Sequence, residues 1–176
     1  MELLDLYDYQ RRPTGKIMVR GDEHPEGMYP PVVHIVIFRP DGRMLIQQRQ
    51  SFKKGWPNYW DISVGGSAQT GEDSPTAAMR ETREELGLTV DLTGRRPTLT
   101  NCSGGAFDDI YILELPVELS ALRLQPEEVQ SAAFATQEEI FAMIDDGRFI
   151  PYLKSFIMLL FDLHRRGGMV DCSKKK

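Results

Sequence analysis

The segment from Gly66 to Leu88 constrains this chain most, because it joins a glycine-rich turn to a short acidic helix. It reads GSAQTGEDSPTAAMRETREELGL, and its glutamates Glu81, Glu84 and Glu85 are spaced i, i+3 and i+4. At about 3.6 residues per turn, these side chains share one face of a helix. Mg2+ prefers oxygen ligands and is commonly shared between protein carboxylates and substrate phosphates. The segment therefore predicts a site for metal-assisted phosphate chemistry.

The same letters set the ends of this helix. Ser74 is a favoured N-cap residue, Pro75 suits the first helical position, and Gly87 suits the C-terminal stop. We therefore predict a helix over residues 75–86.

A solvated helix face is the alternative interpretation of the three glutamates, with Arg80 and Arg83 relieving their charge through helical ion pairs. The glycines before the helix argue against it. Residues 65–66 and Gly71 let the loop fold back, so that backbone carbonyls and a fourth carboxylate, Glu72, approach the helix. We therefore favour metal binding.

This segment resembles the signature of the Nudix family, G-x5-E-x7-R-E-U-x-E-E-x-G-U, in which U is an apolar residue. The matching residues are Gly66, Glu72, Arg80, Glu81, Glu84, Glu85, Gly87 and Leu88. Thr82 stands where the family usually has an aliphatic residue, and a threonine methyl group can still pack there. The resemblance implies an α/β fold, namely a Nudix-type α/β/α sandwich with a mixed β-sheet and a loop-helix-loop catalytic motif.

The resemblance also implies a metal-dependent hydrolase that cleaves a diphosphate linkage, in a nucleoside diphosphate derivative or a related small diphosphate. The implied cofactor is Mg2+, with Mn2+ as a substitute. The implied metal ligands are the Gly66 carbonyl, Glu81, Glu84 and Glu85. The implied catalytic residues are Glu84 and Glu85, with Glu72 and Arg80 as an auxiliary pair.

The base that takes the proton of the attacking water stays open. Metal-assisted substitution at phosphorus needs a carboxylate for this step, and Glu84 and Glu85 are the nearest. Members of the family also recruit a base from outside the signature. Four further candidates form two adjacent pairs that are equally consistent with exposed charge: Asp108, Asp109, Glu127 and Glu128.

The residues before the signature resemble the branch that includes isopentenyl-diphosphate isomerases. Arg49 and Lys53 match its diphosphate-binding positions, and an arginine fork fits phosphate oxygens. These isomerases use a cysteine just before the signature and a histidine two residues later, where this chain has Gly65 and Ser67. We therefore expect hydrolase chemistry, with Arg49 and Lys53 binding the substrate. An isomerase-like enzyme and a non-catalytic nucleotide-sensing module are the alternatives.

Histidine and aromatic residues near this region receive no assignment. His24 and His34 lack a third nitrogen ligand for a metal. Trp56, Tyr59 and Trp60 can stack on a base, yet aromatic residues at strand edges are at least as often packing residues.

Composition favours one small enzyme domain over residues 1–176. With 41% hydrophobic residues, 176 residues suffice for one core and are short for two. The net charge of −5 gives no basic footprint for polymeric nucleic acid, and the tail 174–176 is expected to be a frayed end. The expected partner is a small-molecule diphosphate substrate, and formation of a homodimer stays open.

The chain also lacks the marks of a membrane or secreted protein. Its longest apolar run is too short to cross a bilayer, and its acidic start does not resemble a signal peptide. Cys102 and Cys172 are too few and too isolated for a disulfide framework or a zinc site. We expect no membrane partner, a cytoplasmic location and reduced thiols.

The remaining pattern predicts a hairpin that feeds a mixed sheet, followed by two helices whose apolar faces cover it. Strands are predicted over residues 16–20, 32–38, 44–49, 59–64, 88–91, 98–102, 108–119 and 129–135. Helices are predicted over residues 137–145 and 151–165.

Overall fold

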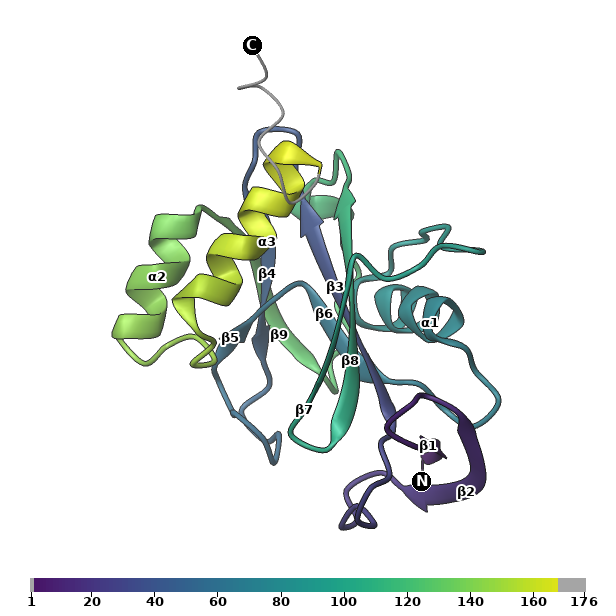
Figure 1. Ribbon diagram of the computed structural model, residues 1–176. Coiled ribbons are helices and arrows are strands. Elements are labelled where there is room, and N and C mark those ends of the chain that lie inside the picture. Colours follow the sequence, from purple (N-terminus) through teal and green to yellow (C-terminus); the bar gives the residue numbers. More distant parts are fainter. Residues whose placement is uncertain (1, 168–176) are drawn as a thin grey trace. The chain divides into compact units, whose positions relative to one another are not determined.

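The computed structural model describes residues 2–167 (Figure 1). In chain order the elements are β1 (Leu3–Tyr7), β2 (Pro13–Val19), β3 (Pro31–Phe38), β4 (Met44–Arg49), β5 (Trp60–Asp61), β6 (Val64–Ser67), α1 (Ser74–Leu86), β7 (Leu99–Ser103), β8 (Ala106–Glu114), the 3-10 helix η1 (Leu119–Ala121), β9 (Val129–Ala135), α2 (Gln137–Asp145) and α3 (Lys154–Arg166). Cys172 and the basic tail 174–176 lie outside the described residues.

The strands form a two-stranded sheet and a larger mixed sheet. Strands β1 and β2 pair antiparallel with each other. In the larger sheet the order is β5-β4-β3-β8-β7, with β6 paired to β3 and β9 paired to β4. The antiparallel register of β7 and β8 places Asn101 opposite Asp108, and that of β4 and β9 places Gln47 opposite Ala132.

The chain divides into two compact units, and strands β3, β6 and β8 and helix α1 each contribute residues to both. Among the described residues, one unit comprises 2–35, 65–84 and 88–111, and the other comprises 36–64, 85–87 and 112–167. The expectation of one domain over residues 1–176 stays a prediction.

Helix α1 packs by one face and presents charge elsewhere. Its residues Ala78, Thr82 and Leu86, spaced by four, are fully buried. The Thr82 hydroxyl donates to the Ala78 carbonyl at 2.7 Å, which satisfies a polar group that would otherwise be costly to bury. Threonine therefore fills a position where an aliphatic residue was expected.

The two C-terminal helices bury apolar side chains, as predicted. Helix α2 begins with a capping box between Thr136 and Glu139, and it buries Ile140 and Met143. Helix α3 buries Ile157, Leu160 and Phe161. It ends at Gly167, whose φ of 62° is a left-handed conformation that favours glycine.

The secondary-structure predictions are confirmed at several elements and wrong at others. The bounds predicted for β4, β9 and α2 are confirmed, and α1 differs by one residue. Residues 88–91 were predicted as a strand but form none. They have no pairing partner in either sheet, and Thr89 and Asp91 are exposed. Strand β1 was missed, and β8 ends at residue 114 rather than 119.

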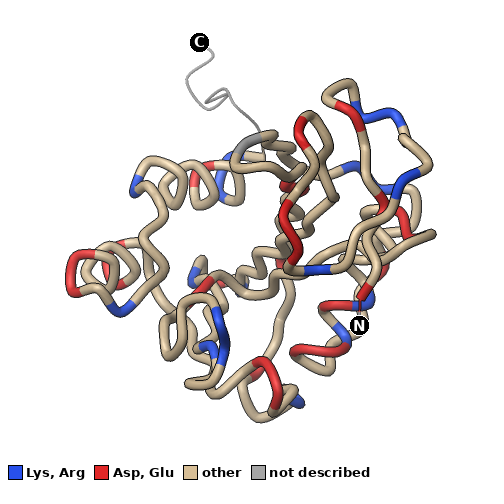
Figure 2. Tube along the Cα trace, turned by 90° about the horizontal axis from the view of Figure 1, so that it is seen from below, with Lys and Arg blue, Asp and Glu red and all other residues tan. Residues whose placement is uncertain are grey.

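Charged residues are scattered along the trace, with Lys and Arg interspersed among Asp and Glu (Figure 2). Among residues 2–167, no helix has both the length and the apolar character needed to cross a bilayer.

Candidate active site

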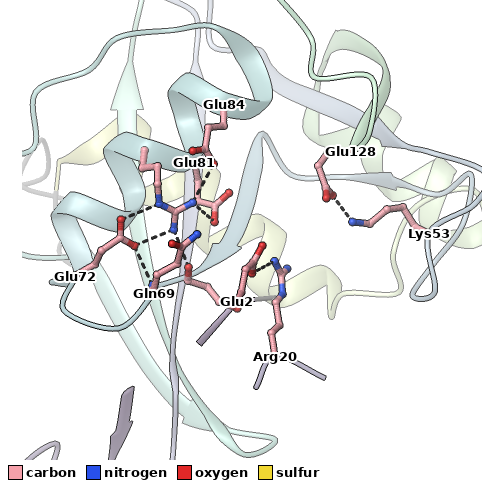
Figure 3. A network of polar contacts seen from close by, with 10 residues as sticks. Glu2, Arg20, Lys53, Gln69, Glu72, Glu81, Glu84 and Glu128 are labelled. Carbon is pink, nitrogen blue, oxygen red and sulfur yellow. Dashed lines mark hydrogen bonds and ion pairs between the residues drawn. The ribbon is translucent and has the colours of Figure 1, made fainter. Parts of the chain in front are cut away.

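Arg80 is the centre of a cluster of residues on α1, on the turn before it and at the end of β6. Figure 3 labels its acidic partners Glu72, Glu81 and Glu84. Its Nε and one terminal nitrogen donate to the two oxygens of Glu72, at 2.8 and 2.9 Å. The other terminal nitrogen donates to Glu81 at 2.9 Å and to Glu84 at 3.0 Å. A further bond of 3.0 Å reaches the Ser67 carbonyl. All five N–H groups of the guanidinium therefore have an acceptor. We call these residues the Arg80 cluster.

The charges of this cluster shift one another's proton affinities. Hydrogen bonds to Glu72 raise the pKa of Arg80 far above its ordinary value, against the effect of burial. Burial raises the pKa of Glu72, but hydrogen bonds from Arg80 and from the Gln69 backbone together bring it below the ordinary value. Burial also raises the pKa of Glu81, and there Arg80 only partly opposes it. The Glu72–Arg80 pair expected from the sequence is thus present and strongly ionic.

Gly66 is required by space rather than by backbone conformation. A Cβ atom at this position would lie 2.1 Å from the carboxyl carbon of Glu81, which is closer than any real contact. At the neighbouring Gly65, a Cβ atom would lie 3.4 Å from Nδ1 of His34, an ordinary contact. Gly65 and Gly66 lie in strand β6 and not in the turn expected from the sequence, and this strand brings the Gly66 backbone against the Glu81 carboxylate.

Glu85 has partners of its own. Its carboxylate is buried and accepts a 2.8 Å hydrogen bond from the side chain of Gln47 on β4. Its backbone carbonyl accepts from the Gln125 N–H at 3.0 Å. Sequence reasoning missed Gln47, although a buried glutamine that follows Leu45 and Ile46 in a buried strand is a signal that something polar faces it.

The donor chemistry of α1 fits a hard cation. Carboxylates of Glu81, Glu84 and Glu85, with the Gly66 carbonyl, are oxygen ligands of the kind that Mg2+ prefers. Within residues 2–167, however, no three acidic, histidine or cysteine side chains converge as a ready-made metal centre. The reason is local: Glu81 and Glu84 share one nitrogen of Arg80, and Glu85 binds Gln47.

Asp109 is the least accessible of the four bases considered outside the signature. It is fully buried, and its carboxylate accepts from Arg11 at 2.8 Å and from Thr100 at 2.7 Å. Burial raises the pKa of Asp109, but the hydrogen bonds, first that of Arg11, lower it below the ordinary value. These contacts make it a structural ion pair.

The other three candidates are more accessible. Asp108 faces His34, whose Nε2 lies 3.3 Å from its carboxylate. Glu127 is exposed. Glu128 forms an ion pair with Lys53 (Figure 3).

The two cations expected to bind substrate both have acidic neighbours. Arg49 lies 3.5 Å from the Asp61 carboxylate and donates to the Gly55 carbonyl at 3.1 Å. Lys53 is held by Glu128. Each side chain stays partly exposed, so an incoming anion has access to it.

Comparisons with known proteins identify the family. Residues 28–153 match the NUDIX domain, and the chain therefore belongs to the Nudix family. It is 46% identical over 163 residues to an uncharacterized Nudix hydrolase of Listeria monocytogenes, over 93% of this chain and 95% of the relative. It is also 32% identical over 126 residues to an isopentenyl-diphosphate Delta-isomerase of Cutibacterium acnes, over 65% of this chain and 62% of the relative.

A solved structure shares the fold. The crystal structure of DR0079 from Deinococcus radiodurans superposes with a TM-score of 0.73 at 25% identity, over 90% of this chain and 97% of that chain. The predicted fold class is confirmed, and the chain is a Nudix hydrolase that acts on pyrophosphate bonds.

Proposed function

We propose that this enzyme requires a divalent cation and cleaves the diphosphate linkage of a nucleoside diphosphate derivative or a related small diphosphate. The observation that carries the proposal is the fit of Gly66 against Glu81. The backbone of β6 runs against the buried Glu81 carboxylate, and any larger residue at Gly66 would displace that side chain. Packing alone does not require so close an approach. It does suit a carbonyl and a carboxylate that share one cation.

The proposed ligands of Mg2+ or Mn2+ are the Gly66 carbonyl, Glu81, Glu84 and Glu85. A cation bound there would offset charge on phosphate oxygens and lower the pKa of the attacking water. Arg80 and Glu72 are positioning residues. Arg80 holds Glu81 and Glu84 through one nitrogen, and Glu72 fixes the guanidinium from the other side with both carboxylate oxygens.

Glu84 is the signature glutamate best placed to take the proton. Its side chain is 43% exposed, whereas Glu81 and Glu85 are buried. A base must reach the water from which it takes a proton, directly or through one further water. Asp108, Glu127 and Glu128 remain candidates from outside the signature.

Arg49 and Lys53 are proposed to bind the diphosphate. Both would exchange part of their present ion pairing, with Asp61 and Glu128, for phosphate oxygens. An arginine offers a planar fork for such oxygens, and a lysine offers a point charge.

A phosphate-release assay tests this function. The panel contains nucleoside diphosphate derivatives and isoprenoid diphosphates, each with Mg2+, with Mn2+ and with chelator. We expect turnover only with a cation, and a loss of at least ~100-fold in Glu84→Gln and Glu85→Gln, because each removes a charge that holds the metal. Glu138→Gln, an exposed glutamate on α2, is the matched control and should keep full turnover.

Near-normal turnover of both signature variants in chelator would contradict the proposal. The isomerase alternative has its own readout. Gly65 and Ser67 supply neither a thiol nor an imidazole, so mass spectrometry should find no conversion of isopentenyl to dimethylallyl diphosphate. Detection of that product would favour the isomerase.

A further inference from the structure

The loop over residues 50–59 carries exposed aromatic side chains that the proposed chemistry does not use. Trp56 is 46% exposed and Phe52 is 67% exposed. Tryptophan has a large flat surface that is favourable to cover. A tryptophan left this exposed on a loop is therefore a candidate for contact with a ligand.

The backbone of this loop is strained at the tryptophan. Trp56 has a φ of 51° and Asn58 has a φ of 65°, both in the left-handed region. Asparagine tolerates this conformation, but a bulky aromatic residue rarely adopts it. Such strain persists only where the surroundings impose it, and it clusters at ligand sites.

Neighbouring groups impose this conformation. The Arg49 guanidinium donates to the Gly55 carbonyl at 3.1 Å, and the side chain of Gln48 donates to the Asn58 carbonyl at 3.0 Å. The ring of Tyr59 meets the indole of Trp56 edge to face, with centroids 5.3 Å apart. The indole is thus held in place while nearly half of the residue stays exposed.

The loop is also linked by hydrogen bonds to Glu85, a proposed metal ligand that belongs to the same compact unit. The Glu85 carbonyl accepts from Gln125 N–H, and the Gln125 carbonyl accepts from Glu128 N–H, each at 3.0 Å. The Glu128 carbonyl in turn accepts from Gln50 N–H at 3.0 Å, and the Glu128 side chain binds Lys53. A continuous hydrogen-bonded path therefore runs from Glu85 to the loop.

We propose that Trp56 is a specificity-determining residue that stacks on a nucleobase attached to the diphosphate, and that this contact selects nucleotides over isoprenoid diphosphates. This inference rests on the proposed diphosphate hydrolysis. Arg49 contacts Gly55, the residue next to Trp56, so a diphosphate held by Arg49 would bring its attached group to the indole. A nucleobase stacks on an aromatic face at the surface.

An isoprenoid chain fits this loop less well. Such a chain needs an apolar groove that removes it from water. The exposed residues of this loop are mixed, because Phe52 is apolar whereas Lys54 and Asn58 are polar. A flat ring can cover the indole face and keep its polar edge in water, whereas a hydrocarbon chain on this exposed indole would keep much of its apolar surface in water.

Fluorescence gives a direct test, because the chain has two tryptophans, Trp56 and Trp60. The Trp60→Phe variant leaves Trp56 as the only indole. It is titrated with ADP, CDP, isopentenyl diphosphate and inorganic pyrophosphate, with Ca2+ in place of Mg2+ to slow turnover. We expect the nucleotides alone to quench the emission. The matched Trp56→Phe variant, which reports from Trp60, should show no such quenching.

A second variant separates stacking from folding. Trp56→Gly removes the ring but suits the left-handed backbone, so the loop keeps its conformation. We expect the dissociation constant for nucleotides to rise about 10-fold, while that for pyrophosphate changes less than twofold and the melting temperature does not fall. Nucleotide binding within twofold of wild type in Trp56→Gly, or equal quenching by pyrophosphate, would overturn the proposal.

The phosphate-release assay keeps the two proposals apart. If nucleotides are hydrolysed and Trp56→Gly binds them normally, the stacking site is wrong and the hydrolase function stands. If no diphosphate is hydrolysed, the function is wrong. Selective quenching of Trp56 by nucleotides would then still support the stacking site, and its absence would overturn it.

Discussion

The Arg80 cluster and the 50–59 loop show two ways in which one chain positions polar chemistry. In the cluster, a side chain only 14% exposed has an acceptor for every N–H group. In the loop, Trp56 is exposed and its backbone is in the left-handed region, which a bulky residue rarely adopts. The first arrangement is fixed by hydrogen bonds among largely buried charges, and the second leaves an aromatic ring exposed.

This difference suggests a division of labour. Groups that hold a cation must keep their geometry, and satisfied buried hydrogen bonds provide that rigidity. Groups that recognise the rest of a substrate gain from exposure and from adaptable loops on a fixed support. We therefore expect substitutions in the cluster to affect stability most, and substitutions in the loop to affect substrate binding most.

Arg80→Ala should give the largest loss of stability. It leaves Glu72 and Glu81 partly buried without their cation, and breaking a buried ion pair in this way costs about 3 to 5 kcal/mol. Urea unfolding measures the free energy. Arg83→Ala, an exposed arginine on the same helix, is the control and should stay within about 0.5 kcal/mol of wild type. A loss below about 1 kcal/mol for Arg80→Ala would show that the cluster is not a structural support.

Arg49→Ala should act on the substrate rather than on the fold. We expect kcat/KM for an active diphosphate to fall by the equivalent of about 1.5 to 3 kcal/mol, the range for a lost charge-assisted hydrogen bond. Arg49→Lys should restore only part of the loss, because an ammonium cannot form a bidentate fork. If alanine at both Arg49 and Lys53 leaves kcat/KM within about twofold, these residues are ordinary surface cations.

Gly65 and Gly66 are adjacent in strand β6 and can be compared directly. Gly66→Ala places a methyl group against the Glu81 carboxylate and should cost about 1 to 3 kcal/mol of stability, the range for overpacking, together with most of the activity. Gly65→Ala meets His34 at an ordinary distance and should change both little. Equal effects of the two substitutions would mean that the close approach at Gly66 has no special role.

Glu72→Gln should produce the smallest effect, a change in how stability depends on pH. The folded-state pKa of Glu72 lies below its ordinary value of 4.5, so its ionised form stabilises the fold above that pH. This stabilisation is lost as the pH falls through the lowered pKa. The variant should therefore lose less stability than wild type on acidification below pH 4.5, as measured by unfolding between pH 3 and 7. Parallel curves would contradict the assignment.

Glu81 should affect the pH dependence of stability in the opposite direction. Burial raises its folded-state pKa, so its contribution to stability is present at low pH and is lost as the pH rises through that raised value. The acid sensitivity of this region should consequently come from Glu72 and not from Glu81.

The sequence predicted the parts of the site that depend on local spacing. Helix geometry alone places Glu81, Glu84 and Glu85 on one face, and Ser74 and Gly87 mark the ends of α1. The sequence could not reveal contacts between residues that are far apart along the chain. Gln47 lies 38 residues from Glu85, and Arg11 lies 98 residues from Asp109, so only the tertiary fold brings them together.

The errors in secondary structure have a similar cause. Strand β1 forms because it pairs with β2, and its five residues carry too weak a pattern to predict alone. Residues 88–91 carry a strand-like pattern but find no partner. Pairing depends on tertiary structure, and β-propensity is accordingly a weaker guide than helical spacing.

The most direct measurement is the binding of Mn2+, followed by the electron paramagnetic resonance signal of the free ion during titration. We predict that the wild-type protein and Glu138→Gln bind Mn2+ equally, and that Glu81→Gln, Glu84→Gln and Glu85→Gln each bind it at least ~10-fold more weakly, because each removes an anionic oxygen ligand. Unchanged Mn2+ affinity in all three signature variants, with their folds intact, would contradict a metal site on α1.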